Sequence, residues 1–304
     1  MSVNAESIAT TTASMAELST QPEFVLAVKQ SLIEQRAVLA KRLAKGLPIE
    51  TLISQYCAYI DTIVVRAWQL SLPADVSIAL IATGGYGRGE LYPYSDIDLL
   101  LCAESAVQEE NHQAISAFFS LLWDAGFKLG HAVRSPVQCV EACQVDVSTC
   151  TALIEMRCLA GNDGIFQNLK LLIQAPHVYE SSAFFAAKRL EQKQRHDKFH
   201  NTADNLEPNL KDGPGGLRDF HTLSWLAKKL YGVKSLGGLA PLGLLGDAEW
   251  VALLRDWRIV ARLRFGLHLL SKRAEERLLF DYQKGLAELF GLVDTPENLA
   301  VEQL

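Results

Sequence analysis

The chain has 304 residues and a formal net charge of −6, from 29 Lys and Arg against 35 Asp and Glu. A hydrophobic content of 49% and a charged content of 21% exclude wholesale disorder and leave room for roughly two domains with substantial cores. The acidic balance disfavours general attraction to the phosphate backbone, so we expect no nucleic-acid partner.

The sequence shows no sign of a membrane segment or a secretory signal. Its longest apolar run, residues 76–83, is far shorter than the about 20 residues that span a bilayer. Residues 1–21 form a Ser/Thr/Ala-rich stretch without a basic start, which predicts a flexible tail. The six cysteines contain no CxxC pair and are expected to be reduced thiols. We therefore expect a cytoplasmic protein with no membrane partner.

The first ordered part is expected to be helical. Apolar residues recur at helical spacing over residues 23–43 and again over about 49–70. Gly46 and Pro48 lie between the two stretches, as residues that end a helix should. The pattern predicts an N-terminal helical hairpin over residues 22–72.

The pattern then changes to short apolar strands. Strands are predicted over residues 76–82, 97–102 and 127–136, with helices over about 107–125 and 150–159. From residue 181 onward the chain reads as helical, interrupted by Gly/Pro-rich loops over 208–218 and 237–246. We predict an α+β fold with a small mixed sheet over residues 73–180 and a helical domain over 181–304.

Two neighbouring motifs carry the chemistry, GGYGRGE at residues 84–90 and SDID at 95–98. Because side chains alternate along a strand, Asp96 and Asp98 should point the same way. Two converging carboxylates repel unless a cation lies between them, so the pair predicts a divalent metal site, with Mg²⁺ carrying a nucleoside triphosphate as the usual occupant.

The glycines after the first strand predict a turn that can cradle phosphate through backbone N–H groups. Two known phosphate motifs do not fit this turn. A Walker A loop would need Lys after its second glycine, where the chain has Glu90. A dinucleotide-binding GxGxxG read from Gly85 would need its third glycine at the same position.

A glycine turn followed by SDxD on the next strand resembles the nucleotidyltransferase superfamily related to DNA polymerase β. The longer stretch ATGGYGRGELYPYSDIDLLL, residues 82–101, resembles the bacterial bifunctional uridylyltransferase/uridylyl-removing enzymes, which modify the nitrogen-signalling PII protein. A second block, EPNLKDGPGGLRD at residues 207–219, is similar to that family's second characteristic segment. The resemblance covers essentially the whole chain.

The resemblance implies transfer of UMP from UTP to a tyrosine hydroxyl of PII, with release of pyrophosphate, in glutamine signalling. It implies that Asp96 and Asp98 are catalytic and bind Mg²⁺. The expected nucleotide-binding residues are Gly84, Gly85, Arg88, Ser95, Lys211 and Arg218. Arg88 could instead form a salt bridge with Glu90, and the loop carrying Lys211 and Arg218 could be purely structural.

The chain also departs from the family's pattern. Members continue into an HD-type phosphohydrolase domain and tandem ACT domains that this sequence does not contain, so we expect UMP transfer without UMP removal from this chain. His196 and Asp197 are expected to be solvated helix surface rather than an HD site. A third carboxylate is not evident in the strand around Gly130, and the later acids Asp146 and Glu155 are expected to be structural.

Two other functions stay open. The chain could be a nucleotide-binding regulatory fragment without turnover, or a nucleotidyltransferase with an RNA acceptor. The choice of base cannot be read from the motifs, because uracil is selected by a few hydrogen bonds to its edge.

Overall fold

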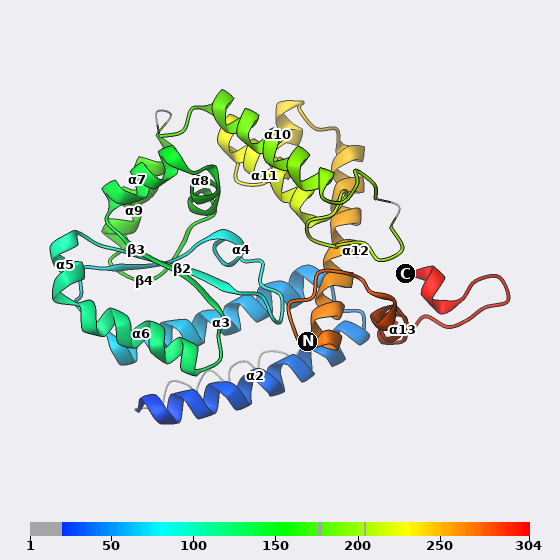
Figure 1. Cartoon of the computed structure of the whole chain (residues 1–304), viewed down its shortest axis with the longest axis horizontal. Helices are drawn as coiled ribbons and strands as arrows, with labels where there is room; N and C mark the ends of the chain where they lie inside the picture. The colour runs from blue at the N-terminus through cyan, green and yellow to red at the C-terminus, as the bar shows by residue number, and fades with distance from the viewer. Residues whose placement is uncertain (1–19, 176–177, 204) are drawn as a thin grey trace. The chain divides into compact units, whose positions relative to one another are not determined.

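The computed structural model describes residues 20–175, 178–203 and 205–304 (Figure 1). Most of the predicted flexible tail lies outside these residues. The described chain divides into two compact units. The first takes the chain up to Val38 together with Ile53–Leu91 and Ser95–Val178, and the second takes Leu39–Leu52, Tyr92–Tyr94 and Tyr179–Leu304. The domain limits predicted from the sequence stay a prediction.

The first unit is built on a four-stranded sheet with the order β3-β2-β1-β4. The strands are β1 (Ala79–Ala82), β2 (Ile97–Cys102), β3 (Leu129–Arg134) and β4 (Arg157–Gly161). β1 runs antiparallel to both β2 and β4, whereas β2 and β3 are parallel. The predicted α+β class with a small mixed sheet is therefore confirmed. All four residues of β1 are buried, as its continuous apolar sequence predicts.

Helices accompany the sheet along the chain. The predicted hairpin helices are α2 (Gln21–Ala44) and α3 (Ile49–Ser71), and within the first unit Ser31 and Tyr59 connect them through a 2.5 Å hydrogen bond between their hydroxyls. Gly46 has a φ of +76°, which suits the glycine predicted to end α2. The remaining helices are α4 (Gly84–Gly87), α5 (Ser105–Glu110), α6 (His112–Asp124), α7 (Pro136–Val145), α8 (Val147–Ile154) and α9 (Asp163–Gln174).

The core of the first unit lies where α3 and α6 meet the sheet (Figure 1). Trp68 of α3 and Phe118 of α6 pack edge to face, with ring centroids 5.7 Å apart. On β3, the ring centroid of His131 lies 4.5 Å from that of Phe119 and 5.3 Å from that of Trp123, so His131 belongs to this aromatic cluster. Because side chains alternate, Gly130 and Ala132 face away from that cluster.

Two sequence predictions in this unit are wrong. The predicted helix over 150–159 is α8 followed by β4, because the apolar run after Met156 pairs with β1. A short apolar run fits a buried strand as well as a helix, and here tertiary pairing decides. The predicted helix over 107–125 is two helices, α5 and α6, which meet at Asn111.

The second unit is helical, as predicted. It contains α10 (Ser181–Asp197), α11 (Leu217–Tyr231), η1 (Leu236–Leu242), α12 (Asp247–Ser271), α13 (Phe280–Leu289) and η2 (Ala300–Gln303). Its core joins the loop before α11 to the last helices through five buried leucines: Leu210, Leu263, Leu267, Leu278 and Leu286. No described helix of either unit combines the length and apolar content needed to cross a bilayer. The six cysteines are free thiols.

Close packing around Gly87 generates the first prediction. A methyl group at this position would place its carbon 2.2 Å from the carbonyl oxygen of Glu155 and 2.7 Å from that of Ala82. Both obstacles are main chain and cannot rotate away. We expect Gly87→Ala to lower the free energy of unfolding by about 1–3 kcal/mol, measured by urea denaturation.

Gly285→Ala is the matched control, because the added carbon would first meet a Leu270 side-chain carbon at 3.4 Å, an ordinary contact. Since Gly285 lies inside α13, this variant should be neutral or more stable by up to about 1 kcal/mol. Equal denaturation midpoints for Gly87→Ala and the wild type would contradict the packing argument.

Candidate functional site

The glycine turn begins where β1 ends. Thr83 follows the strand and donates its N–H to the carbonyl of Asp98 at 3.0 Å, which joins the turn to β2. The turn then closes as the short helix α4, with hydrogen bonds from Gly87 N–H to Thr83 and from Arg88 N–H to Gly84. Gly84 has a φ of +56°, a conformation that glycine adopts without a Cβ penalty. The main chain therefore turns sharply beside β2.

Asp96 and Asp98 occupy the start of β2. Asp96 comes directly before the strand and is exposed, Ile97 is buried, and Asp98 is half-buried. A Cβ built on Gly84 would lie 3.1 Å from Oδ2 of Asp98, so this carboxylate lies directly beside the glycine turn. That Asp96 shares the face of Asp98 stays a prediction, because Asp96 precedes the first residue of β2. Ser95 precedes them and is half-buried.

Arg88 lies among carboxylates. Its Nε is 3.1 Å from Oε2 of Glu90, and its Nη1 is 3.8 Å from Oε2 of Glu155, whose side chain is fully buried. Of the two roles considered for Arg88, the structure contains the salt bridge with Glu90. Glu155 ends α8, so Arg88 ties the glycine turn to that helix. Asp146, the other later acid, accepts hydrogen bonds from the N–H groups of Ser148 and Thr149 and thus caps α8.

An ion pair that the sequence motifs do not reveal supports the glycine turn. Arg157 of β4 binds both carboxylate oxygens of Asp61 on α3, at 2.8 and 3.0 Å. The same guanidinium donates to the carbonyl of Tyr86 at 3.3 Å. Tyr86 is buried, and burial raises the pKa of its hydroxyl well above the usual value. Asp61 and Arg157 are 96 residues apart, so only the fold reveals that they hold α4 in place.

The second motif forms an ordered loop in the second unit. Asn209 Oδ1 accepts hydrogen bonds from the N–H groups of Lys211 and Asp212, and the N–H of Arg218 returns to the carbonyl of Lys211 at 2.8 Å. Asp219 then binds the N–H of Gly215 at 2.8 Å. These contacts, several of them backbone bonds, fix the loop on the start of α11.

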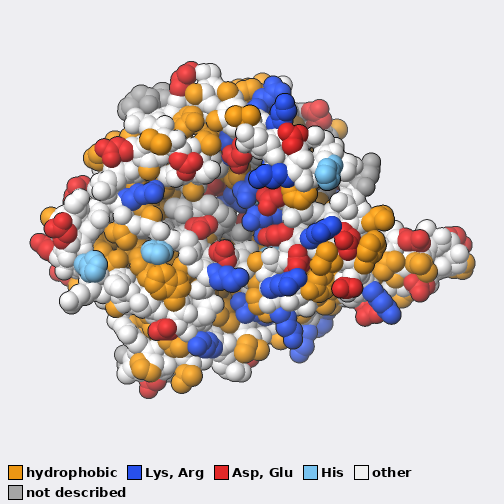
Figure 2. All heavy atoms as spheres, viewed as in Figure 1, with side chains coloured by type: hydrophobic (Ala, Val, Ile, Leu, Met, Phe, Trp, Pro, Cys, Tyr) orange, Lys and Arg blue, Asp and Glu red, His pale blue; other side chains and the backbone are white. Residues whose placement is uncertain are grey.

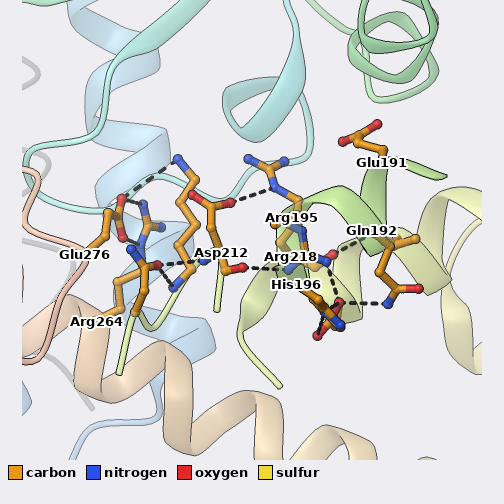
Figure 3. A network of polar contacts seen from close by, with 12 residues as sticks. Glu191, Gln192, Arg195, His196, Asp212, Arg218, Arg264 and Glu276 are labelled. Atoms are coloured by element: carbon orange, nitrogen blue, oxygen red, sulfur yellow. Dashed lines mark hydrogen bonds and ion pairs between the residues drawn. The ribbon is translucent and has the colours of Figure 1, made fainter. Parts of the chain in front are cut away.

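Asp219 also fastens the loop to α10, whose side chains Gln192, Arg195 and His196 are labelled in Figure 3. It accepts hydrogen bonds from Gln192 and Arg195, and Nε2 of His196 lies 3.0 Å from both of its oxygens. Burial would raise the pKa of Asp219, but Gln192, Arg195 and Gly215 hold it below the usual value. The prediction that His196 is solvated helix surface is wrong, because its ring contacts Asp219. The sequence alone does not show that these two residues lie opposite each other.

The predicted basic residues of this loop are both paired with acids. Lys211 Nζ lies 3.8 Å from Oε1 of Glu276, and Arg218 Nε lies 3.3 Å from Oδ1 of Asp212. Figure 3 shows Asp212 with Arg195 and Arg218 beside it, and Glu276 against Arg264. The side chains of Lys211 and Arg218 are 34% and 29% exposed, which leaves part of each open to solvent. Their contact with nucleotide stays a prediction.

Glu276 is the acid that anchors the loop. The buried guanidinium of Arg264 donates to both carboxylate oxygens of Glu276 at 2.6 Å. The backbone carbonyl of Glu276 accepts a hydrogen bond from the N–H of Leu210 at 2.8 Å. Burial would raise the pKa of Glu276, but Arg264 and His268 lower it to about 2. A bidentate charged pair of this kind is strong and directional.

Comparison with known families places both motifs. The family model "GlnD PII-uridylyltransferase" matches residues 183–304, and the model "Putative nucleotidyltransferase DUF294" matches residues 33–132. The first match includes the loop of the second motif, and the second includes the glycine turn with both aspartates.

Curated relatives match across both units. A bifunctional uridylyltransferase/uridylyl-removing enzyme of Xanthomonas euvesicatoria pv. vesicatoria is 48% identical over 266 residues, 88% of this chain and 30% of the relative. The enzyme of the same name from Pseudomonas aeruginosa is 42% identical over 289 residues, 95% of this chain and 32% of the relative. The predicted family resemblance is confirmed. The chain contains a nucleotidyltransferase domain and spans about a third of the length of these uridylyltransferase relatives.

The Glu276 pair generates a pH prediction. Its folded pKa of about 2 lies below its usual 4.5, so the stabilisation is complete above pH 4.5 and is lost as the pH falls toward 2. We expect Glu276→Gln to lower the free energy of unfolding at pH 7 by about 3 kcal/mol, because the variant loses the stabilisation that corresponds to this pKa shift and leaves Arg264 buried without its charged partner.

Urea denaturation at pH 7 and pH 3 measures this effect. The difference in free energy of unfolding between the wild type and Glu276→Gln should be smaller at pH 3 than at pH 7. Glu288→Gln serves as the control, because Glu288 is exposed on α13 of the same unit and should change little at either pH. If the gap stayed constant from pH 7 to pH 3, the pairing would not explain the stability.

Proposed function

We propose that this chain transfers UMP from UTP to a tyrosine hydroxyl of the PII regulatory protein, releases pyrophosphate and acts in the cytoplasm. The observation that carries the proposal is the carboxylate of Asp98 beside the glycine turn, with Asp96 two residues before it. The family description names PII uridylylation, and the curated relatives are named for uridylyl transfer. The chain covers 30% and 32% of the length of the two relatives described above.

The residues at this site fit a divalent ion such as Mg²⁺. Asp96 and Asp98 offer hard oxygen ligands, which magnesium prefers. The absence of a side chain at Gly84 keeps space open next to Oδ2 of Asp98. Among the described residues, no group of three or more His, Cys, Asp or Glu side chains gathers as a metal cage. A pair of carboxylates suits an ion that takes its other ligands from substrate phosphates and water.

Bound there, the ion would polarise the phosphates and offset the charge that develops on the departing pyrophosphate. The chain's own residues would do the positioning. Gly84 and Gly85 allow the backbone to approach the triphosphate closely, and Arg88, held by Glu90 and Glu155, stiffens the turn. In the reaction the tyrosine oxygen bonds to the α-phosphorus, the bond to the β-phosphate oxygen breaks, and the hydroxyl proton is released.

Ser95, Lys211 and Arg218 are proposed to contact the nucleotide as well. Lys211 and Arg218 are held by carboxylates in the ordered loop and keep part of each side chain exposed. Partial exposure allows a cation to exchange a carboxylate partner for phosphate at little cost in free energy. On the face drawn in Figure 2, Lys and Arg side chains lie among Asp and Glu side chains, which does not favour an RNA acceptor.

The decisive prediction concerns the two aspartates. Asp98→Asn and Asp96→Asn should each lower the rate of UMP transfer to PII by at least about 100-fold, since each removes a ligand charge worth several kcal/mol in the transition state. Mass spectrometry of PII after incubation with UTP and Mg²⁺ measures the product. ATP, CTP and GTP supplied in parallel report base selection.

Asp75→Asn is the matched control, because Asp75 is an exposed acid of the same unit outside both motifs and should leave the rate unchanged. A PII variant with its acceptor tyrosine changed to Phe should receive no UMP. Tight UTP binding without product would instead identify a regulatory module. Labelled RNA in place of labelled PII would identify a nucleic-acid acceptor. Undiminished transfer by both aspartate variants would refute the metal assignment.

A further inference from the structure

Gly130 on β3 lies directly beside the carboxylate of Asp98. β2 and β3 are parallel neighbours, and their register pairs Asp98 with Gly130. Paired residues of adjacent strands point to the same face, so a side chain at residue 130 would point toward Asp98. A Cβ built on Gly130 would lie 2.2 Å from Oδ1 and 3.3 Å from Cγ of Asp98. The carboxylate thus occupies the space that a side chain of β3 would fill.

The backbone itself does not require glycine at this position. Gly130 is not one of the described glycines with a positive φ, so other residues could adopt its conformation. Glycine also weakens a strand interior, because it has no side chain to pack. The three atoms closest to the built Cβ all belong to Asp98. The contact with Asp98 is therefore the reason this position excludes a side chain.

The two oxygens of Asp98 are each bordered by a glycine. Gly84 faces Oδ2, where a built Cβ would be 3.1 Å away, and Gly130 faces Oδ1 at 2.2 Å. A Cβ at Gly130 would overlap the carboxylate, whereas one at Gly84 would make only a tight contact with it. Ala132, two residues further along β3, lies on the same face of the strand as Gly130 but pairs with Leu100 and not with Asp98.

We propose that Gly130 is a positioning residue that determines the orientation of the Asp98 carboxylate toward the metal and nucleotide. The inference rests on the proposed function of Asp98 and deepens it. An added methyl group would overlap Oδ1 of Asp98 and force the carboxylate of this short side chain to rotate. The same rotation would move a ligand oxygen, and a working metal site needs its ligands held within about 0.5 Å.

The test compares Gly130→Ala with Ala132→Ser, which enlarges a side chain on the same face of the same strand by one heavy atom. Three quantities are measured for each variant and the wild type: the melting temperature, the binding of Mn²⁺ in the presence of a non-hydrolysable UTP analogue by electron paramagnetic resonance, and UMP transfer to PII as a function of Mg²⁺ concentration. Mn²⁺ binding reports the site without requiring turnover.

For Gly130→Ala we expect a melting temperature equal to or above that of the wild type, Mn²⁺ binding at least tenfold weaker, and a half-saturating Mg²⁺ concentration raised at least tenfold. Ala132→Ser should match the wild type in all three. Unchanged Mn²⁺ binding by Gly130→Ala would overturn the proposal. So would a large drop in its melting temperature, or an equal loss in Ala132→Ser.

Failure of the proposed function gives a different result. If the wild type bound Mn²⁺ with the analogue but transferred no UMP to PII, the acceptor assignment would be wrong. A loss of Mn²⁺ binding confined to Gly130→Ala would still support the role of Gly130 under those conditions.

Discussion

The antiparallel pairing of β1 with β2 is the constraint on which the candidate site depends. It brings the end of β1 and the start of β2 to the same edge of the sheet, where the N–H of Thr83 binds the carbonyl of Asp98. Backbone pairing alone therefore places the glycine turn beside the Asp98 carboxylate. Arg157 and Asp61 add a second support beneath the turn, through the carbonyl of Tyr86.

The second motif is organised by the same kind of interaction, an acid held by several donors. Asp219 binds α10 and the loop, while Glu276 binds Arg264 and lies near Lys211. Each acid has a pKa below its usual value because these donors outweigh the effect of burial. These contacts fix the conformation of the loop at neutral pH, where both acids are ionised.

The sequence predicted the features that depend on local chemistry. β2 was predicted with its observed bounds, and the hairpin helices and the glycine that ends α2 followed from periodicity and turn residues. β4 was missed, because a short apolar run becomes a strand only through pairing with β1. The partners of His196 and Lys211 were missed for the same reason, since Asp219 and Glu276 are brought to them by the fold. Whether the aspartates and the loop bind nucleotide stays a prediction.

The glycines near the candidate site are required for three different structural reasons, which the sequence does not distinguish. Gly84 is required by its left-handed backbone, Gly87 by two carbonyl oxygens, and Gly130 by a carboxylate. These causes have different consequences. A side chain at Gly87 would press on main chain and destabilise the fold, whereas one at Gly130 would displace the carboxylate of Asp98 alone. Since both positions read simply as glycine, stability and ligand binding have to be measured together to separate them.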